Sequence, residues 1–151
     1  MRTVIQRVSK ASVTVHAENY HAGIESGLLV LAAFVDDDTS EDIGWMARKI
    51  ASMRIFDDEN GVMNLSVKDI DGDVLVVSQF TLYASTAKGN RPSYVKAAKP
   101  EKAIPLYERF LDILETHLEK SVRRGIFGAD MKVELLNDGP VTIIVDSKDK
   151  L

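Results

Sequence analysis

The longest apolar run in the chain is Leu28-Leu29-Val30-Leu31-Ala32-Ala33-Phe34-Val35. Gly27 precedes this run and Asp36-Asp37-Asp38 follows it. Its length and these flanks favour a strand buried on both faces over a helix. A second apolar run, Val74-Leu75-Val76-Val77, has the same character and continues directly into Ser78-Gln79-Phe80-Thr81-Leu82. The two runs therefore predict two buried strands.

Two segments show helical periodicity. Thr39 and Asp42 resemble a capping box, which satisfies free amide hydrogens at a helix start, so we expect a helix over about residues 40–54. Its apolar residues recur at helical spacing: Ile43, Met46, Ala47, Ile50 and Met53. A second helix is expected to start between Pro100 and Pro105, since proline is tolerated in the first turn. Its apolar stripe is Ile104, Tyr107, Leu111, Leu114 and Leu118.

Alternation of apolar and polar residues predicts the remaining strands. Residues 4–8 and 12–16 alternate in this way, and we expect a short hairpin connection at Lys10-Ala11 between them. Two later stretches also have strand character: residues 133–136 and 141–145. Asn137-Asp138-Gly139-Pro140 joins these two stretches, and its residue types are typical of a hairpin turn.

Length and helix count bound the fold class. The chain has 151 residues, of which 45% are hydrophobic and 28% charged, a size and composition that fit one globular domain. Two helices are too few to cover both faces of a large parallel sheet. We therefore expect the α/β class, as a single three-layer α/β/β domain over residues 1–151. Two main helices would lie on a mixed sheet, with a second sheet on its other face.

Composition also excludes several function classes. The absence of Cys excludes disulfides, thiolate metal sites and cysteine nucleophiles, and the net charge of −4 argues against coating nucleic acid through bulk charge. No apolar run approaches the roughly 20 residues of a membrane span, and residues 1–7 lack the apolar stretch of a signal peptide. We therefore expect a cytoplasmic protein with no membrane partner. HExxH, GxSxG, GxGxxG and phosphate-loop motifs are absent, so we expect no metal and no cofactor.

Two motifs carry chemical information, and each has a plainer interpretation. Residues 78–82 could be a strand end whose hydroxyls bond the neighbouring backbone. As a site, the same segment offers the hydroxyls of Ser78 and Thr81, the amide of Gln79, and backbone N–H groups that can point at an oxyanion. Residues 137–142 are a hairpin turn by residue type. A Gly-Pro pair can also present main-chain carbonyls on a rigid frame with no Cβ in the way.

Ordered motifs along essentially the whole chain carry a family resemblance. They are Gln6-Arg7-Val8, Arg54-Ile55-Phe56, Ser78-Gln79-Phe80-Thr81-Leu82, Gly89-Asn90-Arg91-Pro92-Ser93, Leu106-Tyr107-Glu108, Gly125-Ile126-Phe127-Gly128-Ala129-Asp130-Met131 and Asn137-Asp138-Gly139-Pro140-Val141-Thr142. In these motifs the chain resembles the D-aminoacyl-tRNA deacylase (D-tyrosyl-tRNA deacylase) family. The resemblance implies a fold of the deacylase type and hydrolysis of the ester between a D-amino acid and the tRNA 3′ end. It also implies a homodimer with each site at the subunit interface.

The resemblance implies a catalytic pocket lined by Ser78, Gln79, Phe80 and Thr81. The backbone amides of Phe80 and Thr81 would stabilise the oxyanion. Thr81 has no His, Lys or Cys in its motif to activate it. We therefore prefer attack by water, assisted by the 2′-hydroxyl of the terminal ribose, with Thr81 positioning the water. A nucleophilic Thr81 remains the alternative.

Substrate selection is also implied by the resemblance. Gly139 and Pro140, cis in this family, would reach into the pocket of the other subunit as a chirality filter. Their carbonyls would hold the amino group and crowd the place of an L side chain, so glycyl-tRNA should also be accepted. Arg7 would brace the Gly-Pro loop, although an outward-facing strand residue is the plainer interpretation. Three residues resemble those that hold the terminal adenosine: Phe127, Gly128 and Met131.

Residues 88–102 carry five basic side chains and one acidic side chain. Such a segment is commonly a solvated loop, but beside a pocket for the 3′ end it indicates phosphate contacts and affinity that falls with salt. We therefore expect the acceptor end of aminoacyl-tRNA as the partner. Three competing functions remain: a related branch that removes L-alanine from mischarged tRNA, a nucleic-acid-binding protein without turnover, and a hydrolase for small metabolite esters.

Overall fold

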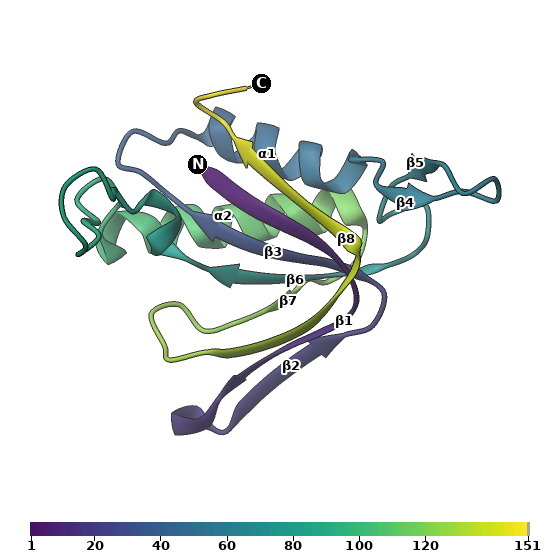
Figure 1. Cartoon of the computed structure of the whole chain (residues 1–151), viewed down its shortest axis with the longest axis horizontal. Coiled ribbons are helices and arrows are strands. Elements are labelled where there is room, and N and C mark those ends of the chain that lie inside the picture. Colours follow the sequence, from purple (N-terminus) through teal and green to yellow (C-terminus); the bar gives the residue numbers. More distant parts are fainter. Residues whose placement is uncertain (151) are drawn as a thin grey trace.

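The computed structural model describes residues 1–150 as a mixed α/β fold with two helices, a six-stranded sheet and a two-stranded sheet (Figure 1). The large sheet has the order β2-β1-β3-β6-β7, with β8 also paired to β1, and the small sheet is β4-β5. The strands are β1 Arg2–Val15, β2 Tyr20–Ile24, β3 Gly27–Ala33, β4 Phe56–Asp57, β5 Met63–Leu65, β6 Asp73–Ser78, β7 Arg123–Arg124 and β8 Lys132–Asp146. The helices are α1 Ser40–Ser52 and α2 Pro100–Leu118, with 3-10 turns η1 His16–Glu18 and η2 Phe80–Tyr83. The predicted fold class is confirmed.

The two long apolar runs form the parallel centre of the large sheet. β3 and β6 pair with Leu28 opposite Val74 and Ala32 opposite Ser78. One face of this pair packs against α1 and α2, and the other packs against β2 and the second half of β1. Both strands are therefore buried on both faces, as their composition predicted.

β1 is one strand of 14 residues, so the predicted hairpin at Lys10-Ala11 is wrong. Both residues pair with β8 in the extended conformation, and Ser9 is an extra residue that interrupts this pairing. The chain reverses only at η1, where Asn19 takes a left-handed conformation and its amide bonds to the His16 carbonyl. The second half of β1 curls with β2 over the sheet and supplies the third layer (Figure 1).

α1 begins at the predicted capping box. The Thr39 hydroxyl accepts from the Asp42 amide, and the Asp42 carboxylate accepts from the Thr39 amide. In α2, Ile104 is exposed rather than part of the buried stripe, because Ala103 takes the inward place four residues before Tyr107. No helix within residues 1–150 is long and apolar enough to cross a membrane.

β8 is also a single strand, so the predicted turn at residues 137–140 is wrong. Val8 of β1 faces Asn137, whereas Gln6 faces Thr142. Residues 138–141 therefore bulge out of a ladder that continues on both sides. Because β1 pairs with β8 on both sides of these residues, the turn-forming residue types produce a bulge rather than a chain reversal. A bulge is one of the few places in a sheet where proline is tolerated.

Candidate active site

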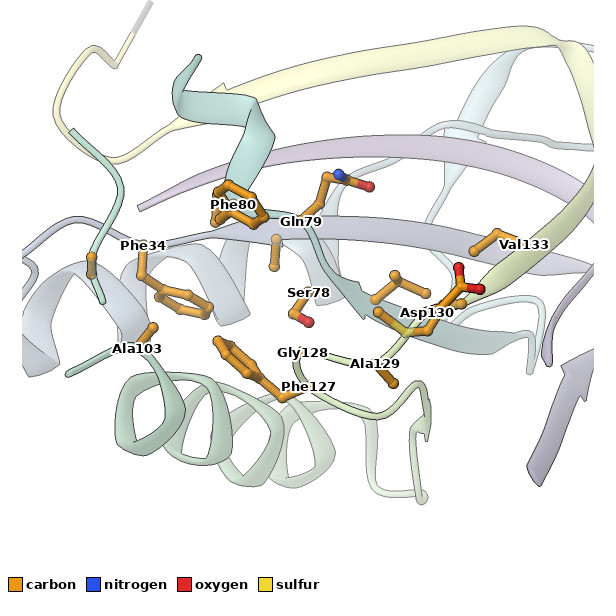
Figure 2. Close-up of a pocket in the computed structure, with 15 residues that line it drawn as sticks. Phe34, Ser78, Gln79, Phe80, Ala103, Phe127, Gly128, Ala129, Asp130 and Val133 are labelled. Carbon is orange, nitrogen blue, oxygen red and sulfur yellow. The ribbon is translucent and has the colours of Figure 1, made fainter. Parts of the chain in front are cut away.

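A cavity of about 250 Å³ opens at the carboxyl ends of the parallel strands β3, β6 and β7 (Figure 2). Open α/β sheets usually bind ligands at this edge, where the chain leaves the strands in loops. The cavity is lined by Ala32, Ala33, Phe34, Val77, Ser78, Gln79, Phe80, Ala98, Ala103, Phe127, Gly128, Ala129, Asp130, Met131 and Val133. Six of the predicted site residues are therefore brought together: Ser78, Gln79, Phe80, Phe127, Gly128 and Met131.

Two backbone donors follow the end of β6, and one of them belongs to Phe80, which lines the cavity. Ser78 is the last residue of β6, and the Gln79 N–H adds one more ladder bond, 2.8 Å long, to a carbonyl of β3. η2 then begins at Phe80, and its first hydrogen bond runs from the Leu82 N–H to the Gln79 carbonyl at 3.2 Å. The N–H groups of Phe80 and Thr81 precede that bond and have no acceptor within the helix.

Thr81 does not line the cavity, although its three predecessors do. Its hydroxyl accepts a hydrogen bond from Nε2 of Gln79. An amide N–H donates and cannot take up a proton, so this partner holds the Thr81 hydroxyl in place without activating it as a nucleophile.

Phe127 packs in a group of three aromatic rings that connects the cavity to α2. Its ring lies 5.7 Å from the ring of Tyr107 on α2, and Tyr107 in turn meets Phe34 edge-on at 6.4 Å. Burial raises the pKa of the Tyr107 phenol well above its ordinary value, so Tyr107 stays neutral and acts as packing. Figure 2 shows Phe34 and Phe127 on one side of the pocket and Asp130 and Val133 on the other, with Ser78 between them.

Two glycines shape the loop between β7 and β8. Gly128 has a φ of +78°, a conformation that L side chains rarely adopt. A Cβ on Gly125 would collide with the sulfur of Met131. Gly125 therefore lets the Met131 side chain lie along the cavity wall.

The structure does not bring Gly139 and Pro140 to this cavity. Both lie in the bulge of β8, their peptide bond is cis, and Gly139 has a φ of +139°. Neither residue lines the cavity. Figure 1 shows the middle of β8 and the carboxyl end of β6 at opposite ends of the sheet.

Arg7 holds the bulge in place. Only 9% of the residue is exposed, so it does not face solvent as the alternation of its strand would allow. Its Nε donates to the Asp138 carbonyl at 2.9 Å, and its Nη1 donates to the Ile55 carbonyl at 2.8 Å. Nη1 also lies 3.5 Å from the Asp57 carboxylate. The guanidinium thus ties the bulge to the segment that follows α1.

Comparison with known proteins decides the family. Residues 4–146 match the family model described as D-Tyr-tRNA(Tyr) deacylase. The chain belongs to this family. A relative from Flavobacterium johnsoniae named D-aminoacyl-tRNA deacylase is 64% identical over 150 residues, which cover 99% of each chain. One of the same name from Bacteroides fragilis is 59% identical over the same share. As a D-Tyr-tRNA(Tyr) deacylase family member the chain is a hydrolase, and deacylation of D-aminoacyl-tRNA is the activity that this membership supports.

Solved structures share the deacylase fold. One, described as c-Myc DNA Unwinding Element Binding Protein, is 40% identical with a TM-score of 0.88 and covers 97% of this chain and 98% of that chain. Another is described as a probable eukaryotic D-amino acid tRNA deacylase, with a TM-score of 0.83 over 95% of this chain and 97% of that chain. Its 18% identity shows a common fold alone.

Several residues that line the cavity were not predicted from the sequence. Phe34 could have been found, because it follows directly after β3, whose Ala32 pairs with Ser78 at the same edge of the sheet. No feature of the sequence indicated Ala103 on α2 or Val133 on β8, because only tertiary packing brings these two elements to this edge of the sheet. Among residues 1–150 no group of three or more His, Asp or Glu side chains is arranged to hold a metal ion.

Proposed function

We propose that the chain hydrolyses the ester bond of D-aminoacyl-tRNA and releases the free D-amino acid and tRNA. The observation that carries this proposal is the pair of free backbone N–H groups, of Phe80 and Thr81, beside a cavity in a member of the deacylase family. Such donors stabilise the charge that develops on the ester carbonyl oxygen. Removing one comparable donor from an enzyme lowers the rate by about 10²–10³.

The hydrolytic step needs few side chains. A water molecule positioned by Thr81 adds to the carbonyl carbon, and the oxyanion forms against the two N–H groups. The bond from the carbonyl carbon to the ribose 3′ oxygen then breaks, and the proton lost by the water passes to that oxygen. The neighbouring 2′-hydroxyl of the substrate assists this transfer by hydrogen bonding.

The terminal adenosine would be held by the loop after β7. Phe127 offers an aromatic face, Met131 an adaptable thioether, and Gly128 a close backbone approach. Unpaired bases are commonly bound by stacking on aromatic side chains. The ester carbonyl of a nucleoside bound here would lie near the carboxyl end of β6.

Gly139 and Pro140 would act on a second copy of the chain. Their distance along the sheet from their own cavity supports a site shared between two subunits. The carbonyls of the pair would hold the substrate amino group and crowd the position of an L side chain, while a D side chain points away. Arg7 would hold Gly139 and Pro140 in position through its hydrogen bond to the Asp138 carbonyl.

A homodimer would form along β8. Within residues 1–150 this strand pairs with β1 along one edge only, and its other edge is open. Three exposed apolar residues lie on the strand, Leu135, Leu136 and Ile144, and Ile144 is 70% exposed. A long open edge with apolar side chains is a ready template for pairing with another chain. An enzyme that acts on aminoacyl-tRNA would work in the cytoplasm, where translation takes place.

The first experiment compares release from D-tyrosyl-tRNA and L-tyrosyl-tRNA at matched concentration, without added metal. We expect fast release from the D ester alone. Glycyl-tRNA should also be hydrolysed at high enzyme concentration, because glycine has no side chain for the filter to reject. Complete resistance of glycyl-tRNA would contradict the filter.

The competing functions give different results in the same assay. Faster hydrolysis of L-alanyl-tRNA than of D-alanyl-tRNA would assign the chain to the related L-alanine branch. Binding of tRNA with no turnover of any ester would favour a nucleic-acid-binding protein. Equal rates on amino-acid esters that lack tRNA would favour a hydrolase for small metabolites.

A further inference from the structure

An exposed aromatic pair stands on the outer wall of the cavity. The rings of Phe80 and Tyr94 meet edge-to-face, with centroids 5.1 Å apart and planes at 74°. Phe80 is 54% exposed and Tyr94 is 39% exposed. Phe80 also lines the cavity, so the pair continues the cavity wall outward onto the protein surface.

Tyr94 is held in place by backbone hydrogen bonds on both sides. Ser85 and Ser93 form an antiparallel bridge, with N···O distances of 2.8 and 2.9 Å. On the other side the Ala97 amide bonds to the Tyr94 carbonyl at 3.1 Å, and the Ala98 amide bonds to the Phe34 carbonyl of the cavity wall at 2.9 Å. The aromatic pair is therefore a preorganised surface, and residues 86–92 project from it as a loop.

This loop and the segment after it are positively charged. Lys88 and Arg91 lie in the loop, and three further cations follow in the sequence: Lys96, Lys99 and Lys102. All five are exposed, and none forms an ion pair with another of the residues 1–150. Glu101 is the one acidic residue among residues 88–102. Unpaired cations beside exposed aromatic rings are the combination that binds single-stranded nucleic acid.

We propose that Phe80 and Tyr94 bind the unpaired nucleotide that precedes the terminal adenosine of the tRNA, while Lys88 and Arg91 contact its phosphates. This inference rests on the proposed function, which puts the terminal adenosine in the cavity. A strand that leaves the cavity past Phe80 meets the Tyr94 ring next, and there its base stacks on the aromatic pair. The pair is thus a second base-binding subsite of the same substrate.

The test uses one D-tyrosyl ester on three carriers: full tRNA, the trinucleotide CCA, and adenosine alone. The Tyr94→Ala variant should raise KM by about 5- to 100-fold on tRNA and on CCA, the range expected for one lost base–aromatic stack. Its kcat should change little, and the adenosine ester should react as with wild type. Tyr94→Phe keeps the ring and should retain the wild-type KM on all three carriers.

A binding measurement separates this inference from the proposed function. A CCA oligonucleotide with 2-aminopurine in place of its second cytidine should be quenched by wild type and Tyr94→Phe but not by Tyr94→Ala. Equal quenching by all three proteins would overturn the subsite, even if wild type hydrolyses D esters. Failure of wild type to hydrolyse any D ester would reject the proposed function, and the quenching would still decide the subsite.

The matched control is Val62→Ala. Val62 is 57% exposed on the connection between β4 and β5, so this variant removes an exposed apolar side chain away from the cavity. The Val62→Ala variant should behave as wild type on all three carriers.

An equal rise in KM on all three carriers for Tyr94→Ala would mean that Tyr94 shapes the cavity through Phe80. That result would overturn the second subsite.

Discussion

Thr81 has a hydroxyl beside the proposed oxyanion site, and within residues 1–150 no basic side chain is hydrogen-bonded to it. Its hydrogen-bond donor is the Gln79 amide, which cannot accept a proton. Thr81→Ala should therefore keep the rate of D-tyrosyl-tRNA hydrolysis within about tenfold of wild type, since one neutral hydrogen bond is worth about 0.5–1.5 kcal/mol. Thr81→Val, which keeps the shape of the side chain, should agree with it. A loss of several orders of magnitude with unchanged thermal unfolding would make Thr81 the nucleophile.

Gly139 is the residue at which an added methyl group should be most damaging to the proposed filter. Its φ of +139° is strained for any L side chain, and a Cβ would lie 3.0 Å from Nη2 of Arg7 and 2.9 Å from Cγ2 of Val141. Gly139→Ala should therefore lower the free energy of unfolding by about 1–3 kcal/mol and reduce hydrolysis of D-tyrosyl-tRNA. Urea unfolding and the hydrolysis assay measure the two effects.

Gly61→Ala is the matched control for that substitution. Gly61 also has positive φ, +74°, but a Cβ there would meet nothing within 4 Å. The Gly61→Ala substitution should lower the free energy of unfolding by about 1–2 kcal/mol without loss of hydrolytic activity. Equal activity of the two variants would remove Gly139 from the functional site.

At the scale of elements, the start of α1 is joined to the end of the chain through Asp42. Burial raises the pKa of Asp42, but hydrogen bonds from Lys148 and the Thr39 amide outweigh it and hold the pKa well below its ordinary value. A lowered pKa in the folded state stabilises the fold above the ordinary pKa near 3.8. This contribution is lost progressively as the pH falls below that value toward the folded-state pKa.

Asp42→Asn should lower the free energy of unfolding at pH 7 by about 0.5–2 kcal/mol, the usual worth of a helix cap. The difference from wild type should shrink below about pH 4, where the unfolded-state carboxyl becomes protonated. Urea unfolding across pH 3–7 measures this. Glu41→Gln removes a neighbouring first-turn charge that makes no ion pair within residues 1–150, and its effect should be smaller. An Asp42→Asn effect independent of pH would contradict the charge argument.

At the scale of the whole molecule, the proposed site is divided between two ends of one sheet, because the cavity lies at the end of β6 and Gly139 lies in the bulge of β8. If two copies complete each other, two differently damaged chains should restore activity on mixing. Ala129→Trp fills the cavity and Gly139→Ala disturbs the filter, so each homodimer should lose most of its activity. Random mixing should recover about a quarter of wild-type activity, because half the dimers would hold one intact site of two. Full activity of a wild-type chain that sediments as a monomer would reject the shared site.

The helices and the central strands could be predicted because their signals are local. The capping box of Thr39 and Asp42 involves residues three apart, and the burial of residues 28–30 and 32–34 follows from a continuous apolar run. The residue types at the end of β6 likewise indicated a site, and the cavity is found there. Such features depend on neighbours within one turn or one strand.

The sequence by itself therefore determined two helices, two buried strands and the motifs that carry the family resemblance. Tertiary structure alone decided that Lys10-Ala11 and residues 137–140 lie within long strands. Lys10 and Ala11 pair with β8, and the bulge at residues 138–141 is flanked on both sides by pairs between β1 and β8. The Asp138 carbonyl is bonded by Arg7, 131 residues earlier. Turn propensity is a weak local preference, and the paired ladder of β1 with β8 outweighs it on both sides of the bulge.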